Sequence, residues 1–469
     1  MKKRNTTILL TSLCCMFGMS AFAAAEENTP VLTLATFISE ATKNDTRFEE
    51  ILIDKLPLQY RRDALLPTKD LLVSLKQEFH LFLNPLDVGG RTTVSLAQLF
   101  PDSGTQLSTA YNKPATTSGN HNASLQFLIS QPIAENAYGR NYKLQDQLIG
   151  VANDIVRYQI VEAYEDYLAS LTTVWYNWFS AWENLKVSRT SYQSNEKLLE
   201  NILERKRQKI ALPIDVNKMK LSLIRKQENI VVLQEIFDNL SNLIFSAMRL
   251  PPGQRFIPAT MEINNQTIVF EEAYQRFVND SRTYHALELL EKKSSLAVDK
   301  AADDLLPSTN LLLGYQMDAE YWGIKPQQNS FFAGISLDWP VKNSVDKAKL
   351  SIARAEKKKT VLSKQNKYEE LHTNLKNIHL QIQREQELMT IAEQKIKLAE
   401  SILKDETENY SFGKVSLNDY IDAVNDVDEN RFSRTDHSVK LNKLLIEWHR
   451  LTDTLLDKTE GLDSKTLLE

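Results

Sequence analysis

Apolar residues recur every three to four positions along much of the second half of this 469-residue chain. That spacing predicts one helix from Ser344 to Tyr410, because residues three and four apart share a face of a helix. At about 1.5 Å per residue this helix would be on the order of 100 Å long, several times the width of a globular core. The apolar stripe consists of Leu371, Leu375, Ile378, Ile382, Leu388, Ile391, Ala392, Ile396, Ala399, Ile402 and Leu403.

The chain is expected to turn back at the end of this helix. Gly413 tolerates a positive φ just after the helix, and Ser416 followed by Asp419 has the spacing of an N-cap and its reciprocal acid. A second helical seam then runs from Ser416 to Leu456 and is narrow enough for coiled-coil packing. The two segments therefore predict an antiparallel helical hairpin.

The first half of the chain predicts a similar hairpin. Helical spacing runs from about Tyr142 to Lys209 and again from Pro213 to Leu250. Pro213 suits the first turn of a helix, where its missing N–H costs nothing. Shorter helical patterns are expected at Leu32–Tyr60 and Phe270–Lys300.

Apolar and polar residues alternate in four short segments, which predicts four β-strands. These segments lie around Leu71–Leu81, Leu125–Gln131, Leu311–Met317 and Phe331–Trp339. The polar stretch Asn84–Asn122, which contains glycine and asparagine, is interpreted as the loop that joins the first two strands.

Three landmarks recur in the same order in both halves, which indicates an internal two-fold repeat. A Leu-Leu-Pro sequence precedes the first strand of each half, a proline ends the second strand, and an aspartate follows each hairpin turn. The expected divisions are a signal peptide at 1–23, a first repeat at 24–250, a linker at 251–269, a second repeat at 270–456 and a tail at 457–469.

The N-terminus has the pattern of a secretory signal peptide. Three basic residues precede an apolar run, and Ala21-Phe22-Ala23 provides a small-residue cleavage site. Cleavage there would remove Cys14 and Cys15, the two cysteines, and would change the formal net charge from −5 to −8 because three basic residues are lost. An acidic exported chain without thiols has no thiolate metal site, and it lacks the positive charge that binds nucleic acid.

The rest of the chain is expected to hold no window apolar enough for a membrane-spanning helix, so any membrane entry must use strands. Four strands cannot close into a barrel, and open sheet edges leave backbone groups unpaired in lipid. Three copies of the chain would supply twelve strands and remove the edges. The expected fold class is an α+β membrane protein, in which long helical hairpins form a periplasmic barrel that continues a shared 12-strand transmembrane β-barrel.

This order of elements resembles the TolC-like outer-membrane efflux and secretion ducts. The resemblance rests on the export signal, on Leu-Leu-Pro before a strand, on strands that end in Gln-Pro or Trp-Pro, and on the segment YSFGKVSLNDYIDA at 410–423. It implies a homotrimer in the outer membrane of a Gram-negative bacterium, reaching into the periplasm. It also implies a periplasmic adaptor and an inner-membrane pump of the RND, ABC or MFS type, which would deliver drugs, metabolites or secreted polypeptides.

The resemblance assigns roles to residues at the hairpin tips. The two acids after the glycine turn, Asp419 and Asp422, would line the periplasmic aperture. Asp215 and Tyr410 would belong to the links that hold this aperture shut. The basic partner that the family has in this turn would fall on a valine here, so that link is either absent or made by Lys414.

Four acids follow the second hairpin turn at steps of three, four and three residues, which places them on one helical face. They are Asp419, Asp422, Asp426 and Glu429. In a trimer the first two would form a ring of six carboxylates, a constriction that favours cations. Asp426 and Glu429 are equally well explained as a solvated helix face, and Asp419 as a capping acid.

Two groups of aromatic residues have structural explanations. A stripe at helical spacing, formed by Trp175, Trp178, Phe179 and Trp182, predicts packing between helices, with a substrate-contacting wall as the alternative. A second group near the strand ends predicts a belt at the membrane interface, with ordinary strand packing as the alternative. This second group consists of Tyr315, Tyr321, Trp322 and Trp339.

The sequence predicts neither an enzyme nor a cofactor site. His372 and His379 are seven residues apart, but no third ligand has a suitable spacing for a metal ion. Glycine-rich phosphate loops, nucleophile elbows and HExxH sequences are absent. The alternative to a duct is a secreted periplasmic coiled-coil adaptor or structural protein, which would have no use for strands with outward apolar residues.

Overall fold

The computed structural model describes residues 29–83, 86–116, 122–251, 254–261, 268–319 and 326–458. The predicted signal peptide and most of the predicted tail lie outside these residues, as do Tyr321 and Trp322. The chain divides into two compact units, and each takes segments from both predicted repeats. The helical unit comprises Met1–Leu52, Val161–Ser281 and Leu371–Glu469, and the sheet unit comprises Ile53–Ile160 and Arg282–Glu370.

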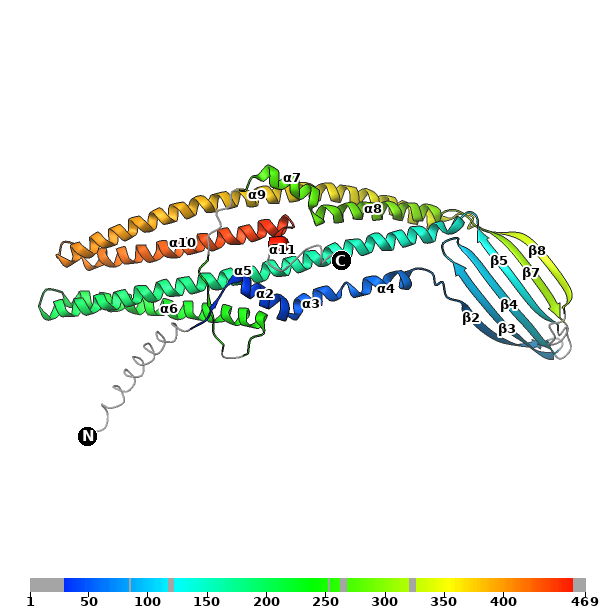
Figure 1. Ribbon diagram of the computed structural model, residues 1–469, viewed down its shortest axis with the longest axis horizontal. Coiled ribbons are helices and arrows are strands. Elements are labelled where there is room, and N and C mark those ends of the chain that lie inside the picture. The colour runs from blue at the N-terminus through cyan, green and yellow to red at the C-terminus, as the bar shows by residue number, and fades with distance from the viewer. Residues whose placement is uncertain are drawn as a thin grey trace, which may run out of the picture. The chain divides into compact units, whose positions relative to one another are not determined.

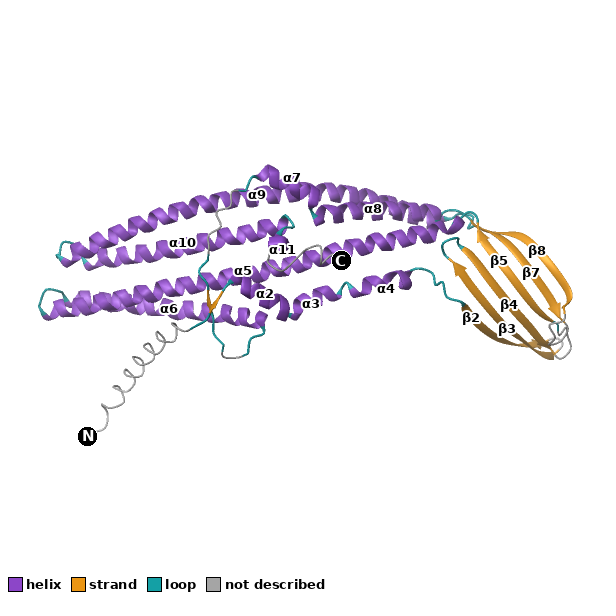
Figure 2. Cartoon of the chain, viewed as in Figure 1, coloured by secondary structure: helices purple, strands orange, loops and turns teal. Residues whose placement is uncertain are grey.

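Four long helices form two hairpins (Figures 1 and 2). Helix α5 (Arg140–Arg207) precedes α6 (Pro213–Met248), and α9 (Ser344–Ser411) precedes α10 (Leu417–Leu451). α5 and α9 each contain 68 residues, and the predicted bounds of the first three helices are confirmed to within two residues. The predicted fourth helix ends earlier than expected, and the short α11 (Leu455–Lys458) follows it.

Shorter helices and strands precede and separate the two hairpins in the sequence. The predicted helical segment after residue 32 is divided into three helices, and the one predicted at 270–300 is broken at Ser281. Ser281 donates a 2.6 Å hydrogen bond to Asp453 in the helical unit. The elements are β1 (Val31–Leu32), α2 (Leu34–Asn44), α3 (Thr46–Ile53), α4 (Leu56–Leu65), the 3-10 helix η1 (Ala137–Gly139), β6 (Ile257–Pro258), α7 (Phe270–Asp280) and α8 (Arg282–Asp303).

The aromatic stripe of α5 lies in the core of the helical unit, which confirms the packing interpretation. Trp178 is fully buried, and its Nε1 donates a 2.8 Å hydrogen bond to the hydroxyl of Ser241 on α6. Its ring stacks on Phe237 with the ring centroids 6.0 Å apart. Because both partners come from α6, this core holds the first hairpin together. The other members of the stripe, Trp175, Phe179 and Trp182, lie in or against the same core.

Six antiparallel strands form one sheet in the sheet unit, in the order β2-β3-β4-β5-β7-β8 (Figure 2). The four predicted strands correspond to β2, β5, β7 and β8. The bounds are β2 (Leu72–Leu83), β3 (Leu86–Phe100), β4 (Thr105–Thr116), β5 (Ala123–Pro132), β7 (Ser308–Ala319) and β8 (Pro326–Asp338).

The expectation of four strands per chain is therefore wrong. The stretch 84–122, expected to be a connecting loop, contains β3 and β4. Alternation on β3 is carried by Val88, Val94 and Leu96 but is interrupted by Gly89-Gly90, which weakens the strand pattern in the sequence. Pairing with β2 on one side and β5 on the other stabilises the two strands. A twelve-strand barrel consequently does not follow from three copies of this chain.

The sheet has one apolar and one mainly polar face, because side chains alternate along every strand. Large exposed apolar residues occupy one face at Val73, Leu75, Phe79, Leu81, Val94, Leu96, Leu107, Phe127, Ile129, Leu311, Leu313, Tyr315, Phe331, Ile335 and Leu337. The opposite face carries Ser74, Lys76, Glu78, Arg91, Thr93, Ser95, Gln106, Ser108, Asn112, Ser124, Gln126, Ser130, Asn310, Gln316, Asp318, Ser330 and Ser336. Leu128, Leu312 and Phe332 are apolar members of this second face.

One helix corrects the expectation that no window is apolar enough to span a membrane. Among the described residues, α6 has the length and the composition of such a helix. Part of its apolar surface instead serves the hairpin, because Phe237 and Ile244 lie in the core shared with α5. Composition alone therefore does not identify α6 as a membrane span.

Candidate aperture at the tips of the helical hairpins

The turn between α5 and α6 is closed by an acid from the first turn of α6. Lys209 adopts a left-handed conformation with φ of 63°, which redirects the chain after α5. Pro213 takes the first helical position, as predicted. The carboxylate of Asp215 accepts the backbone N–H of Leu212 at 3.1 Å, so this acid caps the start of α6.

The turn between α9 and α10 has the predicted capping arrangement. Gly413 has a φ of 71°, and its N–H donates a 3.0 Å hydrogen bond to the carbonyl of Tyr410. The Asp419 carboxylate accepts the N–H of Ser416 at 2.9 Å and its hydroxyl at 2.7 Å. These two hydrogen bonds lower the pKa of Asp419 below its usual value. Asp419 is thus a capping acid, and its exposed charge persists at the hairpin tip.

A small apolar cluster joins the two tips. It contains residues from α5 and α6 of the first hairpin and from α10 of the second, with Tyr410 at the end of α9 packed against it. Burial of these side chains holds the ends of the two hairpins together, because separating them would expose apolar surface to water. The buried members are Ile202, Val216, Met219, Leu223 and Leu417.

Arg205 connects the two tips through polar contacts. Its Nη1 donates a 3.1 Å hydrogen bond to the carbonyl oxygen of Tyr410, and its guanidinium carbon lies 5.1 Å from the centroid of the Tyr410 ring. Burial raises the pKa of Tyr410, the charge of Arg205 lowers it, and the charge of Asp215 raises it further. Asp215 and Tyr410 therefore belong to one electrostatic neighbourhood that includes Arg205.

Sequence reasoning missed Arg205 and considered Lys414 for the basic role instead. The Lys414 ammonium lies 5.4 Å from the ring centroid of Phe412, its neighbour in the turn. Arg205 stands in the last turn of α5 among several basic residues, a position that usually indicates favourable interaction with the helix dipole. Distinguishing it from its neighbours requires the contact with the other hairpin.

The four acids of α10 form one exposed stripe. Asp419, Asp422, Asp426 and Glu429 are all exposed to solvent, whereas the intervening Ala423, Val424 and Val427 are buried. The predicted common face is confirmed as geometry by this alternation of exposed and buried positions. An ion in solvent can therefore reach all four carboxylates.

A partly buried ion pair links the two hairpins further from the tips. Lys226 Nζ on α6 lies 2.8 Å from Asp428 Oδ2 on α10, and their side chains are only 14% and 13% exposed. Lys226 also donates to Asn425 at 3.2 Å, and the hydroxyl of Ser191 on α5 donates to Asp428. These groups line a cavity between the hairpins. Asp428 was not among the predicted site residues, because only the contact with α6 separates it from the exposed acids nearby.

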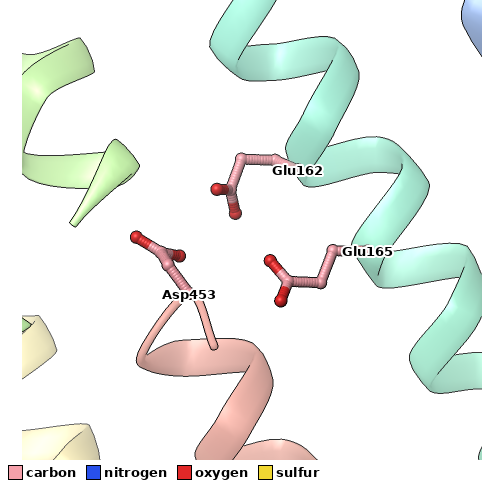
Figure 3. A group of neighbouring side chains, drawn as sticks. All are labelled: Glu162, Glu165 and Asp453. Carbon is pink, nitrogen blue, oxygen red and sulfur yellow. The ribbon is translucent and has the colours of Figure 1, made fainter. Parts of the chain in front are cut away.

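Among the described residues, one group of three carboxylates lies close enough together to share a metal ion (Figure 3). It consists of Glu162, Glu165 and Asp453, and no ion is predicted there from the sequence. Glu165 accepts the backbone N–H of Leu455 at 2.8 Å, and Asp453 accepts the hydroxyl of Ser281. These hydrogen bonds give two of the carboxylates a structural role, because they tie the segment between α10 and α11 to α5 and to Ser281.

His372 and His379 pack around aromatic residues of α7. The ring centroid of Tyr274 lies 4.8 Å from that of His372, and the ring centroid of Phe270 lies 5.5 Å from that of His379. Burial lowers the pKa of His379. These contacts fit a packing role for both histidines.

Comparisons with solved structures place this architecture among known folds. No protein-family model and no curated protein matches the chain. The CmeC outer membrane channel of Campylobacter jejuni is similar with a TM-score of 0.69 and 11% identity, over 92% of this chain and 87% of that one. The outer membrane protein VceC of Vibrio cholerae has a TM-score of 0.67 and 12% identity, over 89% of this chain and 95% of that one.

The MtrE outer membrane channel of Neisseria gonorrhoeae, solved in an open state, is similar over 91% of both chains, with a TM-score of 0.67 and 13% identity. Identities this low establish the fold and leave the activity to be argued from the residues. The agreement nevertheless covers the hairpins and the sheet together, since about nine-tenths of each chain is included. The chain described here has the TolC-like fold of these outer-membrane channels.

Proposed function

We propose that this protein is one subunit of a homotrimeric duct in the outer membrane of a Gram-negative bacterium. The duct conducts small molecules or secreted polypeptides passively from a periplasmic adaptor and an inner-membrane pump to the exterior. One observation carries the proposal: a chain with a TolC-like fold combines a sheet that has an apolar and a polar face with long hairpins whose tips carry exposed acids. An apolar outer face and a polar inner face are what a membrane barrel requires.

Exposed apolar residues on α6 support packing between copies. Leu221, Val232, Ile236 and Leu243 are spaced so that they share one face of the helix, and they are between 44% and 56% exposed. A contiguous apolar stripe on a helix is unfavourable in water and usually marks an interaction surface. Packing against a neighbouring copy would cover it and would set the helices side by side around a tunnel. The internal repeat would then give each copy two similar hairpins in the tunnel wall.

The aperture of this duct is proposed at the hairpin tips. Asp419 and Asp422 from three copies would form a ring of six carboxylates, which attracts multivalent cations and repels anions. Arg205 and Tyr410 would hold the two hairpins of each copy together while the aperture is closed, and Asp215 would cap the neighbouring start of α6. Opening would require the tips to separate at these contacts.

Single-channel recording in planar bilayers tests this function. The purified protein is expected to form channels that multivalent cations such as hexamminecobalt block from one side. Replacing both Asp419 and Asp422 with Ala should abolish this block, because the ring of charge is lost. The matched control replaces Asp426 and Glu429, which belong to the same stripe but lie further from the tip, and it should retain the block. Unchanged block in the first variant would reject the aperture assignment.

Fractionation separates the duct from the adaptor alternative. A duct subunit is expected in the outer-membrane fraction, as a trimer that requires detergent for extraction. A periplasmic coiled-coil adaptor would be found in the soluble fraction, and a water-soluble monomer would overturn the proposal. The apolar sheet face favours the duct, because residues such as Phe79 and Phe331 are more than 70% exposed in a single copy.

A further inference from the structure

We propose that each copy contributes all six strands of its sheet, so that three copies close a β-barrel of eighteen strands. This inference rests on the trimeric duct proposed above and concerns the bore of its outer section. Four observations from the sheet unit carry it: the faces of β3 and β4, the turn that joins them, the stagger of the register, and the two edge strands.

β3 and β4 continue both faces of the sheet. Along one row of cross-strand partners, Leu75 on β2 faces Val94 on β3, which faces Tyr111 on β4, and the row continues to Leu125 on β5. The next row, on the other face, runs through Ser74, Ser95, Ala110 and Gln126. If the β3–β4 hairpin folded outside the barrel wall, its apolar and polar faces would not need to match those of β2 and β5, because they would meet different surroundings. The two strands therefore have the pattern of wall strands.

The turn between β3 and β4 is fixed at the rim where the strands join the helices. Gly104 and Gly139 both have positive φ, and an added Cβ on Gly139 would overlap the carbonyl oxygen of Pro101. The side-chain amide of Gln131, at the end of β5, donates a 2.9 Å hydrogen bond to the carbonyl of Ser103. This close packing places the turn beside η1 and the start of α5, so both strands cross the full height of the sheet.

The register has the stagger of a closed barrel. Successive partners lead from Leu72, the first residue of β2, across the sheet to Phe332, which is six residues before the end of β8 at Asp338. Both of those strand ends lie at the rim that joins the helices. Six residues along a strand are about 20 Å, and five strand spacings are about 24 Å, which gives a strand tilt of about 40°. Closed barrels have tilts of roughly 35–45°.

The two edge strands are complementary. β2 and β8 run antiparallel to each other, because the sheet alternates in direction and contains an even number of strands. β2 has 12 residues and β8 has 13, and both expose large apolar side chains. Long edges of this kind leave backbone groups unpaired in lipid. A second copy of the same chain, pairing its β2 with β8 of the first, continues the sheet without changing the alternation.

The strand count sets the bore. At a tilt of about 40°, each strand occupies about 6.3 Å of the circumference. Eighteen strands then give a backbone radius of about 18 Å, whereas twelve strands give about 12 Å. The outer section of this duct is thus about half again as wide as one built from four strands per copy.

Electron-spin distance measurements test the count in the full chain. Gln126, on the polar face of β5, is replaced by Cys and spin-labelled in a chain whose two native cysteines are changed to Ser. Equivalent backbone positions in a three-fold barrel lie √3 radii apart, about 31 Å for eighteen strands and about 21 Å for twelve. A spin label on the inner face reaches about 6 Å further toward the axis, which shortens both distances by about 10 Å, so eighteen strands predict about 21 Å between labels and twelve predict about 11 Å. A distance near 21 Å supports the proposal. A distance near 11 Å in a trimer overturns it and leaves the duct itself intact.

A deletion provides the second measurement. Removing residues 86–116 deletes β3 and β4 and leaves eight residues to connect the end of β2 to the start of β5. The distance at Gln126 is then expected to shorten by about 10 Å, while that of a control label at Lys218 on α6 stays the same. An unchanged distance at Gln126 would place the hairpin outside the barrel wall and overturn the proposal. If the deleted chain fails to assemble, the full-length distance decides alone.

Native mass spectrometry of the labelled full-length sample counts the copies. A trimer is expected. A protein that forms no oligomer in detergent would overturn the proposed duct and the eighteen-strand barrel together, and this result is distinct from a trimer with the shorter distance.

Discussion

The ion pair between Lys226 and Asp428 is expected to stabilise the closed state of the proposed duct, because it joins the two hairpins of one copy. Lys226→Met keeps the length of the side chain but removes the ammonium that lies 2.8 Å from the carboxylate. Losing one partner costs roughly 3–5 kcal/mol when the pair is fully buried, and roughly 0–1 kcal/mol when it is exposed. Because the two side chains are 14% and 13% exposed, a cost of about 2 kcal/mol is expected for the state in which the hairpins touch.

If the ion pair breaks when the channel opens, losing it raises the ratio of open to closed channels. A cost of about 2 kcal/mol to the closed state corresponds to an approximately 30-fold higher ratio of open to closed channels. Single-channel open fractions of Lys226→Met, Asp428→Asn and the double variant form a cycle that isolates the coupling between the two residues. The double variant is expected to differ little from either single one.

The control is Arg431→Met, which removes an ion pair of similar length within one hairpin. Arg431 lies 2.7 Å from Glu400, but the two side chains are 40% and 46% exposed and join α9 to α10 only. It should leave the open fraction nearly unchanged. The reasoning is refuted if Lys226→Met has no more effect than this control, or if the effects of Lys226→Met and Asp428→Asn simply add.

Three further outcomes are expected. Ser416→Ala should raise the pH at which cation block fades, because the hydroxyl that is lost helps to keep the pKa of Asp419 low. The stabilisation that this cap contributes is present above the pKa of the unfolded chain and is lost as the pH falls through the lowered pKa of the folded chain. An unchanged midpoint of the pH dependence would contradict this role of Asp419. Glu385→Gln should lower the free energy of unfolding, measured with denaturant at neutral pH, by about 2–4 kcal/mol, because the buried carboxylate loses its charge-assisted hydrogen bonds. Burial raises the pKa of this carboxyl, but the hydrogen bonds from a lysine and a histidine lower the pKa by more. The difference from wild type should therefore shrink as the pH falls. Gly413→Ala should cost about 1–2 kcal/mol of stability, because the added Cβ meets open space and only the positive φ is unfavourable. Gly139→Ala should reduce the yield of trimer more than Gly413→Ala does, because its Cβ would overlap the 101–104 turn. Equal yields of the two variants would argue against that packing.

Long elements of this fold could be predicted from the sequence because their signals are strong. Helical periodicity over 68 residues in α5 and in α9 leaves little ambiguity, and Gly413 with Ser416 fixes where the second hairpin turns. β3 and β4 were missed because their alternation depends on threonines and small residues, and the glycine pair 89–90 has the composition of a loop. Their strand character comes from the neighbours on either side.

The candidate site could be predicted only as far as its local chemistry extends. The cap formed by Asp419 follows from its position after the turn and is present, whereas the cap formed by Asp215 was not predicted. Arg205 and Asp428 act through contacts with the other hairpin, and such contacts join residues about 200 positions apart. Single-sequence patterns contain no information about which member of a charged run makes a contact at that separation.

The hairpin of β3 and β4 has a consequence for how such a duct could change over time. It leaves β2 and rejoins the chain before β5 at the rim away from the helices, so inserting or removing it shifts neither of their junctions with the helices. In the proposed barrel, each such event would alter the circumference by two strands per copy and preserve the alternation of strand direction. The width of the proposed barrel and the charge at the hairpin tips would therefore be determined by separate stretches of the chain, and either could change while the other is kept.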